Sequence, residues 1–317
     1  MKKKPKTHLF LTGGLGNQLF QVAAAIDLSA RSQVILHDNL GRPRVNSLGA
    51  PEIESLTLPK NVSVQNHLRF NTFISKVLGY NLRSGFRPTK LESFFQLPIN
   101  LISNVIMSIY LKSFVSIEKS SSLGFDSNVV KLNSNTILIG YFQTFLHITR
   151  IGKEKFVCFP SEVNKKVFEY KALAVSEQPL IIHVRLGDYK YEDEFGILSS
   201  SYYELCLNES WKSNSFGKIW LFSDEPESAL EKLPISMHPY VRIIDSVGLS
   251  SAETLQVMTY GSGYVIGNST FSWWGAYLRE NQAALVYCPQ PWFKNMDEPK
   301  DIVPDLWKRV NGFDSVE

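Results

Sequence analysis

The chain has 317 residues, a formal net charge of +3 and the apolar and charged fractions of an ordinary soluble globular protein. Its length allows two domains with substantial cores, and its composition excludes wholesale disorder. The small net charge gives no reason to expect a nucleic-acid partner. The cysteines are far apart and odd in number, which predicts no disulfide framework and fits a reducing compartment; they are Cys158, Cys206 and Cys288.

The basic first residues predict neither a signal peptide nor a membrane span, because only a short apolar run follows them at residues 9–12. The lysines of this tail are interpreted as a solvated terminus, with weak attraction to anionic lipid as the alternative. Residues 97–115 fall short of the roughly 20 apolar residues of a spanning helix and predict a buried helix or an interfacial segment. We therefore expect a cytoplasmic protein, with at most peripheral contact at the cytoplasmic face of an inner membrane.

A glycine-rich turn joins the first predicted strand, residues 8–12, to a helical pattern that extends to Leu28, and a strand follows at 34–36. The dinucleotide-binding fingerprint fails because Leu19 stands where its third glycine would be, and no G-K-[ST] phosphate loop is present. The turn still brings backbone close to a ligand. Its candidate ligand-binding residues are Gly14, Gly16, Asn17 and Gln18.

Residues 41–135 are poorly patterned, with helices predicted around 68–83 and 97–115. A buried strand at 136–140 ends in Tyr141-Phe142-Gln143, and residues 148–178 turn polar and helical. We place the domain boundary in this region. The prediction is an N-terminal Rossmann-like domain of residues 1–160 with helical insertions, and a C-terminal domain of residues 161–317.

The second half alternates regularly between strands and helices, which predicts a parallel doubly wound sheet. Residues 303–310 are predicted to form a final helix that returns to the N-terminal domain. The other predicted strands lie at 180–185, 218–223, 241–244, 264–267 and 284–287, and helices lie at 202–210, after Pro226, at 251–261 and from about 270.

Three of these strand ends collect polar side chains. In open α/β sheets ligands bind beyond the carboxyl ends of the strands. Arginine suits a phosphate because its planar fork donates two parallel bonds. A cluster of hydroxyls at a helix N-terminus also favours an anion. The three groups are His183 with Arg185 and Asp188, then Ser223-Asp224-Glu225, then Asn268-Ser269-Thr270-Phe271-Ser272.

Each of these groups also has a purely structural interpretation. Arg185 can simply pair with Asp188 at a surface turn. Ser269 or Ser272 can only cap a helix, and Trp273-Trp274 can be core aromatics. A metal site is not predicted, because no D-x-D occurs and the histidines lack ligand spacing.

Taken together, these motifs resemble the α-1,2-fucosyltransferases of glycosyltransferase family 11. The resemblance spans residues 13–276, in the family's order, and is most specific in the last motif. It is carried by Gly13-Gly14-Leu15-Gly16-Asn17-Gln18-Leu19-Phe20-Gln21, Gly140-Tyr141-Phe142-Gln143, His183-Val184-Arg185-Leu186-Gly187-Asp188-Tyr189, Phe222-Ser223-Asp224-Glu225 and Asn268-Ser269-Thr270-Phe271-Ser272-Trp273-Trp274-Gly275-Ala276.

The chain departs from the family pattern at two places. The family has a second arginine where this chain has Leu186. A cysteine and a histidine that the family carries before Asn268 are replaced by residues such as Gly261 and Gly263. The first arginine, which the family uses on the donor pyrophosphate, is present as Arg185.

The resemblance implies a glycosyltransferase of GT-B architecture, with two Rossmann-like doubly wound domains facing across a cleft. It implies an inverting galactoside 2-α-L-fucosyltransferase that moves L-fucose from GDP-β-L-fucose to the 2-hydroxyl of a terminal galactose on a glycan. The C-terminal domain would bind the GDP-sugar, and the N-terminal domain would face the acceptor. No metal or other cofactor is expected, so fixed hydrogen-bond donors must stabilise the leaving group.

The resemblance also implies roles for the residues. The expected catalytic residues are Arg185, Asp188 and His183. His183 and the Asp224/Glu225 pair are also candidates for ribose and guanine contacts. A general base is left open among Asp188, Glu192, Asp193 and Glu194. The expected donor-binding residues comprise the four in the glycine turn together with Arg185, Ser223, Asp224, Glu225, Asn268, Ser269, Thr270, Phe271 and Ser272.

Two alternatives remain open. One is a fucosyltransferase that forms another linkage, such as α-1,6. The other is a protein that binds a GDP-sugar and transfers nothing, which Leu186 favours and the intact Arg185 opposes.

Overall fold

The computed structural model divides the chain into two compact units. One comprises residues 1–158 and 299–302, and the other comprises residues 159–298 and 303–317. The description that follows covers residues 5–29, 32–37, 52–65, 102, 105–109, 111, 114–120, 122–129, 131–132, 134–157, 159–160, 164–213 and 216–314.

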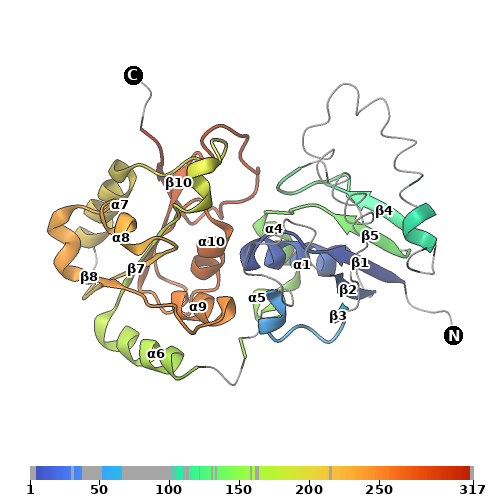
Figure 1. The fold of residues 1–317 in the computed structure, drawn as a ribbon, viewed down its shortest axis with the longest axis horizontal. Helices are drawn as coiled ribbons and strands as arrows, with labels where there is room; N and C mark the ends of the chain where they lie inside the picture. The colour runs from blue at the N-terminus through green and yellow to red at the C-terminus, as the bar shows by residue number, and fades with distance from the viewer. Residues whose placement is uncertain are drawn as a thin grey trace. The chain divides into compact units, whose positions relative to one another are not determined.

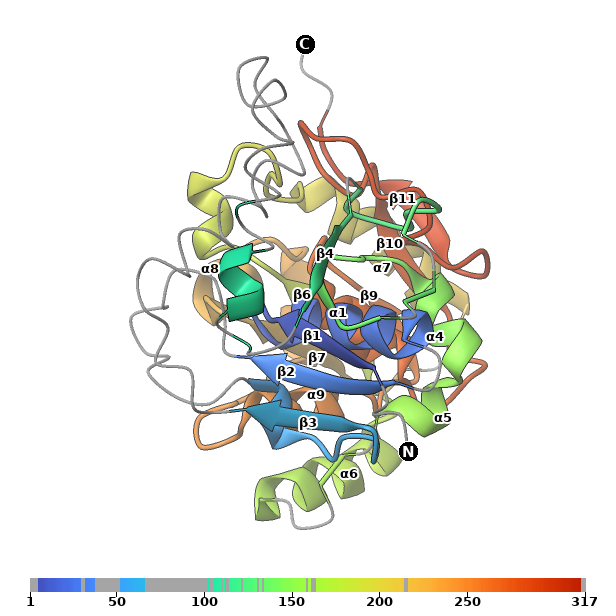
Figure 2. The ribbon, with the colours of Figure 1, turned by 90° about the vertical axis from the view of Figure 1, so that its right-hand side faces the viewer.

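The N-terminal unit contains a five-stranded parallel sheet in the order β3-β2-β1-β5-β4. The inner strands are buried except for the first residue of β1 and of β2, whereas β4 is only partly buried along its length. Figure 2 shows β1, β2 and β3 side by side. The strands are β1 (Lys6–Phe10), β2 (Gln33–His37), β3 (Val62–Gln65), β4 (Ser116–Lys119) and β5 (Thr136–Ile139).

Helix α1 (Leu15–Leu28) starts directly at the glycine turn and is buried on most of its surface, since its inward positions are Leu, Phe, Val and Ala. It packs against α4 (Phe145–Ile151), which Thr144 caps by accepting from the Leu146 N–H at 3.2 Å. The short helices α5 (Lys153–Phe156) and η1 (Glu52–Ser55) lie nearby (Figure 1). The start of α1 is thereby fixed at the carboxyl end of β1.

The C-terminal unit contains a six-stranded parallel sheet in the order β11-β10-β9-β6-β7-β8. Every residue of β6 is buried. The strands are β6 (Leu180–Val184), β7 (Ile219–Ser223), β8 (Val241–Ile243), β9 (Gly263–Val265), β10 (Val286–Gln290) and β11 (Lys308–Asn311).

Helices alternate with these strands along the chain, and a continuous core joins β6, β7 and α7. Helix α9 begins with a capping box between Ser250 and Glu253. The helices are α6 (Lys165–Glu177), η2 (Asp188–Tyr191), α7 (Ser200–Ser213), α8 (Pro226–Leu230), η3 (Ile235–Tyr240), α9 (Ser251–Met258) and α10 (Thr270–Tyr277).

The predicted fold class, two Rossmann-like doubly wound α/β domains, is confirmed, and such a pair of domains is what the GT-B architecture contains. The predicted final helix at 303–310 is wrong. Residues 308–311 instead form β11, which pairs with β10 in the C-terminal unit through Tyr287↔Lys308. The exposed lysine and arginine of β11 suit an edge strand.

The predicted helix at 68–83 lies outside the described residues. Within 97–115, residues 105–109 are helical. Across the part of the chain that the structure describes, no helix is both long and apolar enough to cross a bilayer.

Candidate active site

The three polar groups predicted at strand ends meet at one edge of the C-terminal sheet. Strands β9, β6 and β7 are neighbours and run parallel. Their carboxyl ends therefore share an edge, with Arg185 following β6, Asp224 following β7 and Asn268 following β9. The register pairs Val184 with Ser223, so the β6 and β7 loops begin level with each other.

The guanidinium of Arg185 is held by two carboxylates. Its Nη2 and Nε lie 2.7 Å and 3.0 Å from Oδ1 of Asp188, and its Nη1 lies 3.1 Å from Oδ2 of Asp224. The pairing with Asp188 matches the structural interpretation drawn from sequence, whereas the pairing with Asp224 was not predicted. These contacts engage three of the five N–H donors of an arginine, and the side chain keeps 22% exposure.

Asp224 also ties the two loops together through backbone. Its Oδ1 accepts the Leu186 N–H at 3.1 Å. A Cβ added at Gly187 would lie 2.3 Å from Oδ2 of Asp224, so glycine permits this close approach. Asp224 is therefore a clamp between β6 and β7 as well as a partner of Arg185.

His183 lies beneath this cluster rather than within it. Its side chain is buried, and its Nδ1 has no hydrogen-bond partner among the described residues. Burial, together with the nearby positive charge of Arg185, lowers the pKa of His183 to about 3. The imidazole is thus neutral near pH 7. The Tyr203 hydroxyl donates to the His183 carbonyl at 3.3 Å, which holds the strand end in place.

The loop between β9 and α10 uses most of its polar side chains internally. The Asn268 amide donates to the carbonyls of Phe195 and Gly196 at 3.0 Å and 3.1 Å. Ser269 caps α10 by accepting from the Phe271 N–H at 3.3 Å, and the Ser272 hydroxyl donates to backbone carbonyls within the same turn. The capping interpretation is confirmed for Ser269.

The double tryptophan after this loop belongs to the core. Trp273 and Trp274 are both completely buried, and their rings pack edge to face with centroids 5.0 Å apart. They fix the position of α10 behind its first turn. Thr270 and Phe271, in that first turn, are only partly buried, and these two residues can face a ligand.

Tyr189 connects the arginine loop to the α10 loop. Its hydroxyl donates to the Asn268 carbonyl at 3.1 Å, and the Arg185 guanidinium carbon lies 5.8 Å from the centre of its ring. An added Cβ at Gly267 would lie 3.1 Å from the His183 carbonyl oxygen, so the β6 and β9 ends approach closely as well. The three segments thus form one cluster.

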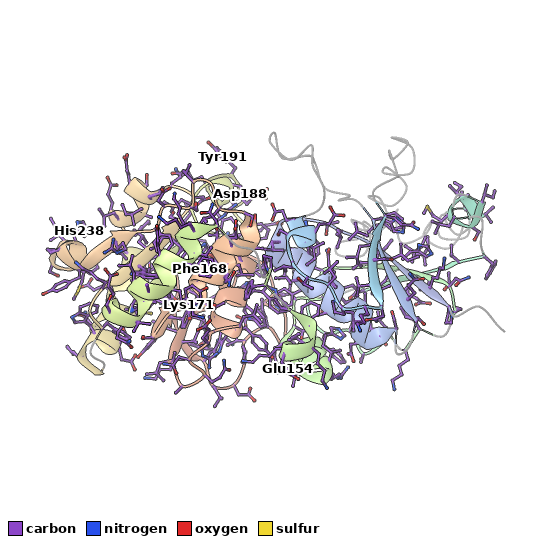
Figure 3. The ribbon with its side chains drawn as sticks, turned by 90° about the horizontal axis from the view of Figure 1, so that it is seen from below. Glu154, Phe168, Lys171, Asp188, Tyr191 and His238 are labelled. Carbon is purple, nitrogen blue, oxygen red and sulfur yellow. The ribbon has the colours of Figure 1, made fainter. Side chains whose placement is uncertain are left out.

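An exposed loop follows Arg185 and carries the remaining acidic candidates. Glu192 and Asp193 are exposed and Glu194 is partly buried, while Glu225 is paired with Lys190. Tyr191 at the end of η2 is 87% exposed, and it is labelled with Asp188 in Figure 3. The loop therefore presents carboxylates and one aromatic ring to solvent beside the cluster.

The glycine turn of the N-terminal unit is held by neutral amides and by one carboxylate, that of Glu52. Gly13 has a φ of +73°, and a Cβ there would lie 2.4 Å from Nδ2 of Asn17, so glycine is required. The Gln18 amide donates to the Gly13 carbonyl and accepts the Ile53 N–H, each at 3.0 Å. The Leu15 N–H at the start of α1 donates to the Glu52 carboxylate at 2.7 Å.

The second N-terminal motif joins the first through Gln143, whose amide donates to Oδ1 of Asn17 at 3.1 Å. The side-chain oxygen of Gln143 is buried and has no partner within the described residues. Two sequence motifs more than a hundred residues apart thus meet at the carboxyl edge of β1 and β5.

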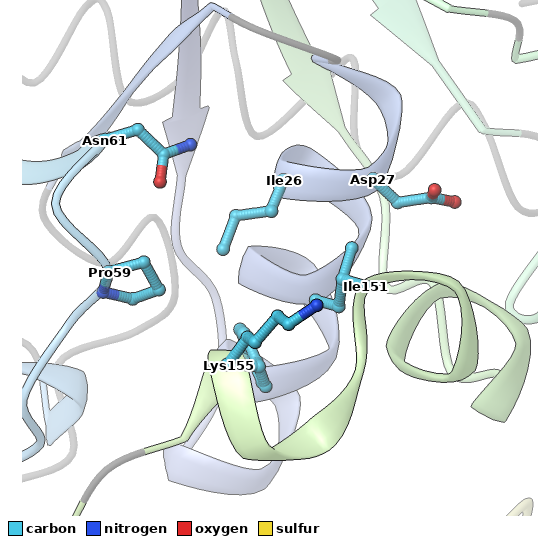
Figure 4. Close-up of a pocket in the computed structure, with 7 residues that line it drawn as sticks. Ile26, Asp27, Pro59, Asn61, Ile151 and Lys155 are labelled. Carbon is cyan, nitrogen blue, oxygen red and sulfur yellow. The ribbon is translucent and has the colours of Figure 1, made fainter.

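A separate pocket in this unit lies at the opposite end of α1 from the glycine turn (Figure 4). Burial alone would raise the pKa of the Asp27 carboxyl, but hydrogen bonds from His147 and Arg150 outweigh it and hold the pKa below its ordinary value. The Asp27 carboxylate is thus ionised, and the positive charge of Arg150 balances it. The pocket is lined by Ile26, Asp27, Pro59, Asn61, Ile151, Lys155 and Phe156.

Among the described residues, no three His, Cys, Asp or Glu side chains gather in a way that could hold a metal ion. Cys206 and Cys288 are buried and free. Burial raises the pKa of the Cys206 thiol well above its ordinary value and that of Cys288 to about 12, so neither is a reactive thiolate near neutral pH.

Sequence reasoning missed the residues that support the cluster from behind. The Tyr202 hydroxyl donates to the Ile266 carbonyl at 2.7 Å, and Tyr203 does the same for His183. Their adjacent position in α7 carried no motif signal.

Leu186, at the family's second arginine position, is 3% exposed and belongs to the core. An added Cβ at Gly261 would lie 2.4 Å from Cγ1 of Ile181, so that position is also close-packed.

Comparison with known proteins yields one family and several relatives. The sequence model of glycosyl transferase family 11 matches residues 135–306. An O-antigen biosynthesis glycosyltransferase, WbnK, from Escherichia coli is 24% identical over 94% of this chain and 98% of its own length. An alpha-1,2-colitosyltransferase from the same species is 24% identical over 95% and 97%. A galactoside 2-alpha-L-fucosyltransferase from Caenorhabditis elegans is 21% identical over 54% and 51%.

Proposed function

The chain belongs to glycosyl transferase family 11 and is a fucosyltransferase-like glycosyltransferase, and from that premise we propose that it moves L-fucose from GDP-β-L-fucose to the 2-hydroxyl of a terminal galactose, with inversion. The acceptor is a glycan such as an oligosaccharide or a surface polysaccharide. The name of one relative, an O-antigen biosynthesis enzyme, supports the latter. A cytoplasmic location stays a prediction.

The observation that carries the proposal is the clamped Arg185. As the bond between GDP and fucose breaks, negative charge grows on the leaving diphosphate, and catalysis requires donors that are already in place. The carboxylates of Asp188 and Asp224 fix the plane of the guanidinium, and two of its five N–H donors are engaged by neither carboxylate. An arginine held in this way costs little to orient at the moment of reaction.

The same clamp creates a charge problem, because two carboxylates outweigh one guanidinium. Asp188 is the more exposed partner, at 53% against 24% for Asp224, and Asp224 is also bonded to the Leu186 backbone. We assign Asp188 as the partner that yields to the diphosphate and Asp224 as the permanent anchor. Asp224 is then a positioning residue rather than a guanine contact.

The first turn of α10 supplies the second set of donors. Helix N-termini favour anions through free N–H groups and the positive end of the helix dipole. Ser269 caps the helix through the Phe271 N–H, and the Ser272 hydroxyl donates to backbone carbonyls. Thr270 is therefore the group that we place nearest the diphosphate. The buried Trp273-Trp274 pair gives this turn a fixed position.

The N-terminal unit is assigned to the acceptor. Its carboxyl edge offers neutral amides from Asn17, Gln18 and Gln143, a chemistry that suits sugar hydroxyls better than a diphosphate. For the general base, Asp188, Glu192, Asp193 and Glu194 remain the candidates. His183 is neutral and buried, so we assign it to positioning the end of β6.

A second donor sugar is favoured by one relative. The alpha-1,2-colitosyltransferase is as similar to this chain as the O-antigen enzyme is, so colitose is the competing donor sugar for the same α-1,2 linkage. The reading as a non-catalytic sugar-nucleotide binder loses support, because Leu186 packs in the core and leaves Arg185 in place.

The test is product identification with the purified protein. GDP-fucose and GDP-colitose are each offered with a panel of galactosides, and products are identified by mass spectrometry, with NMR for linkage and anomeric configuration. We expect a fucosyl α-1,2-galactoside, and far less of it from Arg185→Ala in the same time. Preferential use of GDP-colitose would replace the donor. A different linkage, or GDP-fucose binding without turnover, would overturn the proposal.

A further inference from the structure

Arg185 must keep its orientation while it exchanges one partner for another. Asp188 engages Nε and Nη2 of its guanidinium, and Asp224 engages Nη1. When Asp188 yields to the diphosphate, the pair with Asp224 at 3.1 Å is the hydrogen-bonded anchor that remains among the described residues. A guanidinium with one such contact can turn about it. A second support is therefore needed, and it must leave the N–H donors available.

The ring of Tyr189 is placed to give that support. The guanidinium carbon of Arg185 lies 5.8 Å from the centre of this ring, which is within the range of a cation–π contact. A cation–π contact engages none of the N–H donors in a hydrogen bond. The ring therefore competes neither with the two carboxylates nor with a diphosphate.

The ring of Tyr189 is itself fixed by a hydrogen bond and by packing. Its hydroxyl donates to the Asn268 carbonyl at 3.1 Å, which ties it to the loop between β9 and α10. Its ring packs against Phe195 with centroids 5.1 Å apart, and Phe195 packs against Phe293 with centroids 5.4 Å apart. The ring thus has a defined position before any substrate binds.

Phe195, behind the tyrosine ring, is held by backbone contacts from two loops. Its carbonyl accepts from the Asn268 side-chain amide at 3.0 Å and from the Lys294 N–H at 3.1 Å. Gly196, the next residue, has a φ of +70°, and an added Cβ there would lie 2.5 Å from Cβ of Lys294, so glycine permits this close approach. The rings behind Tyr189 therefore rest on the loops that follow β9 and β10.

We propose that Tyr189 is a positioning residue for the transfer, and that its ring holds the plane of the Arg185 guanidinium while Asp188 gives way to the diphosphate. The inference rests on the proposed function and adds a residue that acts through Arg185 rather than on the substrate. The competing interpretation is that the ring only packs in the fold. Its loss would then lower stability without a specific effect on the recognition of charge.

The first test compares two variants of Tyr189. Tyr189→Leu removes the ring, whereas Tyr189→Phe keeps the ring and removes only the hydroxyl. Initial rates are measured with a galactoside and GDP-fucose, or GDP-colitose if the parent prefers it. We expect kcat to fall about 5- to 30-fold in Tyr189→Leu, the range that a cation–π contact supplies. It should stay within about threefold of the parent in Tyr189→Phe. KM for the sugar nucleotide should change little, because the support matters most as the diphosphate gains charge.

Binding of GDP gives a readout that needs no turnover. GDP carries the charge that the diphosphate gains when it leaves, so calorimetry should show weaker binding to Tyr189→Leu, by a factor similar to the loss in kcat. Tyr189→Phe should bind GDP nearly as the parent does.

The matched control is Tyr170→Leu on α6. It also removes a partly buried ring and a hydroxyl that donates to a backbone carbonyl, that of Asp245 at 3.4 Å. This control should leave both kcat and GDP affinity unchanged.

A double-variant cycle separates positioning from packing. Arg185→Lys has no guanidinium plane to hold, so Tyr189→Leu should cost little further activity in that background. A ring that only packs in the fold would instead cost the same factor in both backgrounds. Circular dichroism and thermal unfolding of every variant check that the proteins compared are folded.

The inference is overturned if Tyr189→Leu keeps the kcat and the GDP affinity of the parent. It is also overturned if Tyr189→Phe is as impaired as Tyr189→Leu, or if the losses in the cycle are additive. Absence of turnover by the parent would instead overturn the proposed function. The two failures are distinguishable, because GDP binding by the parent and its variants is measured without any transfer.

Discussion

The carboxyl edges of the two parallel sheets carry different chemistry. At the N-terminal edge, the polar side chains of Asn17, Gln18 and Gln143 are neutral amides that bond to one another and to backbone. At the C-terminal edge, Arg185 is clamped by Asp188 and Asp224. Neutral amides recognise hydroxyls, whereas a fixed guanidinium can respond to developing charge. The contrast supports our proposal that the acceptor binds at the first edge and the nucleotide at the second.

The strongest way to break this contrast is to change Arg185. Removing one preorganised donor to a developing anion typically costs ~10²–10³ in kcat, about 3–4 kcal/mol. We expect that loss for Arg185→Ala. Arg185→Lys should stay severely impaired, because it keeps the charge but loses the planar fork. The measurement is kcat and KM for both variants, with circular dichroism as the folding control. Near-native turnover of Arg185→Lys would contradict the catalytic role. Arg185 would then serve only to pair with Asp188 and Asp224 in the fold.

Leu186, the neighbour of Arg185, provides the matching test at the C-terminal edge. Its substitution should lower stability and leave turnover nearly unchanged. It is 3% exposed within the core of the C-terminal unit. Leu186→Ala should therefore cost about 2–5 kcal/mol of unfolding free energy, while kcat of the folded protein changes little. Denaturant unfolding checks the first effect and initial rates the second. Leu186→Met, which nearly conserves volume, is the control. A large loss of kcat in folded Leu186→Ala would assign this position to the chemistry.

Sequence reasoning succeeded where the signal was local. The strands of the C-terminal unit are short apolar runs between polar helices, so their order and type could be predicted from Leu180 to Gln290. It failed for β3 and β4, which are only partly buried and have no apolar run. It also failed for β11, because pairing with β10 decides that structure and is not visible in Lys308–Asn311 itself.

The candidate site, too, could be predicted from the sequence only in part. The positions of Arg185, Asp224 and Asn268 at strand ends followed from motif and pattern. The ion pair between Arg185 and Asp224 did not, because it depends on the register of β6 against β7. The support from Tyr203 was also invisible, since a tyrosine in a helix gives no sign of which carbonyl it will reach.

A pair of buried histidines offers a smaller test, on the N-terminal unit. Nδ1 of His8 lies 2.9 Å from Nε2 of His37 across β1 and β2. Burial, with the charge of Lys6, lowers the pKa of His8 to about 4, and burial beside His8 lowers the pKa of His37 to about 3. The unfolded value is about 6.5. The stability that these residues contribute is therefore complete above pH 6.5 and is lost as the pH falls from there toward 3.

Urea unfolding at pH 7 and pH 5 measures this loss. The double variant His8→Leu with His37→Leu should show a smaller decrease in unfolding free energy between the two pH values. His183 in the C-terminal unit, whose pKa is also lowered, is unchanged in the variant and contributes the remaining slope. An identical pH slope in parent and variant would show that the pair does not titrate in this way.

The smallest expected effect is that of chelation, and it tests whether the C-terminal edge works with fixed donors alone. If Arg185 and the first turn of α10 stabilise the leaving diphosphate, no divalent cation is needed for that task. Among the described residues, no cluster of acidic or histidine side chains could hold a divalent cation. EDTA should therefore leave the initial rate essentially unchanged. The control is a metal-dependent transferase in the same buffer. A loss of activity that manganese or magnesium restores would mean that a cation shares the charge assigned here to Arg185. The ionic chemistry that we assign to the C-terminal edge would then depend on a metal ion as well as on Arg185.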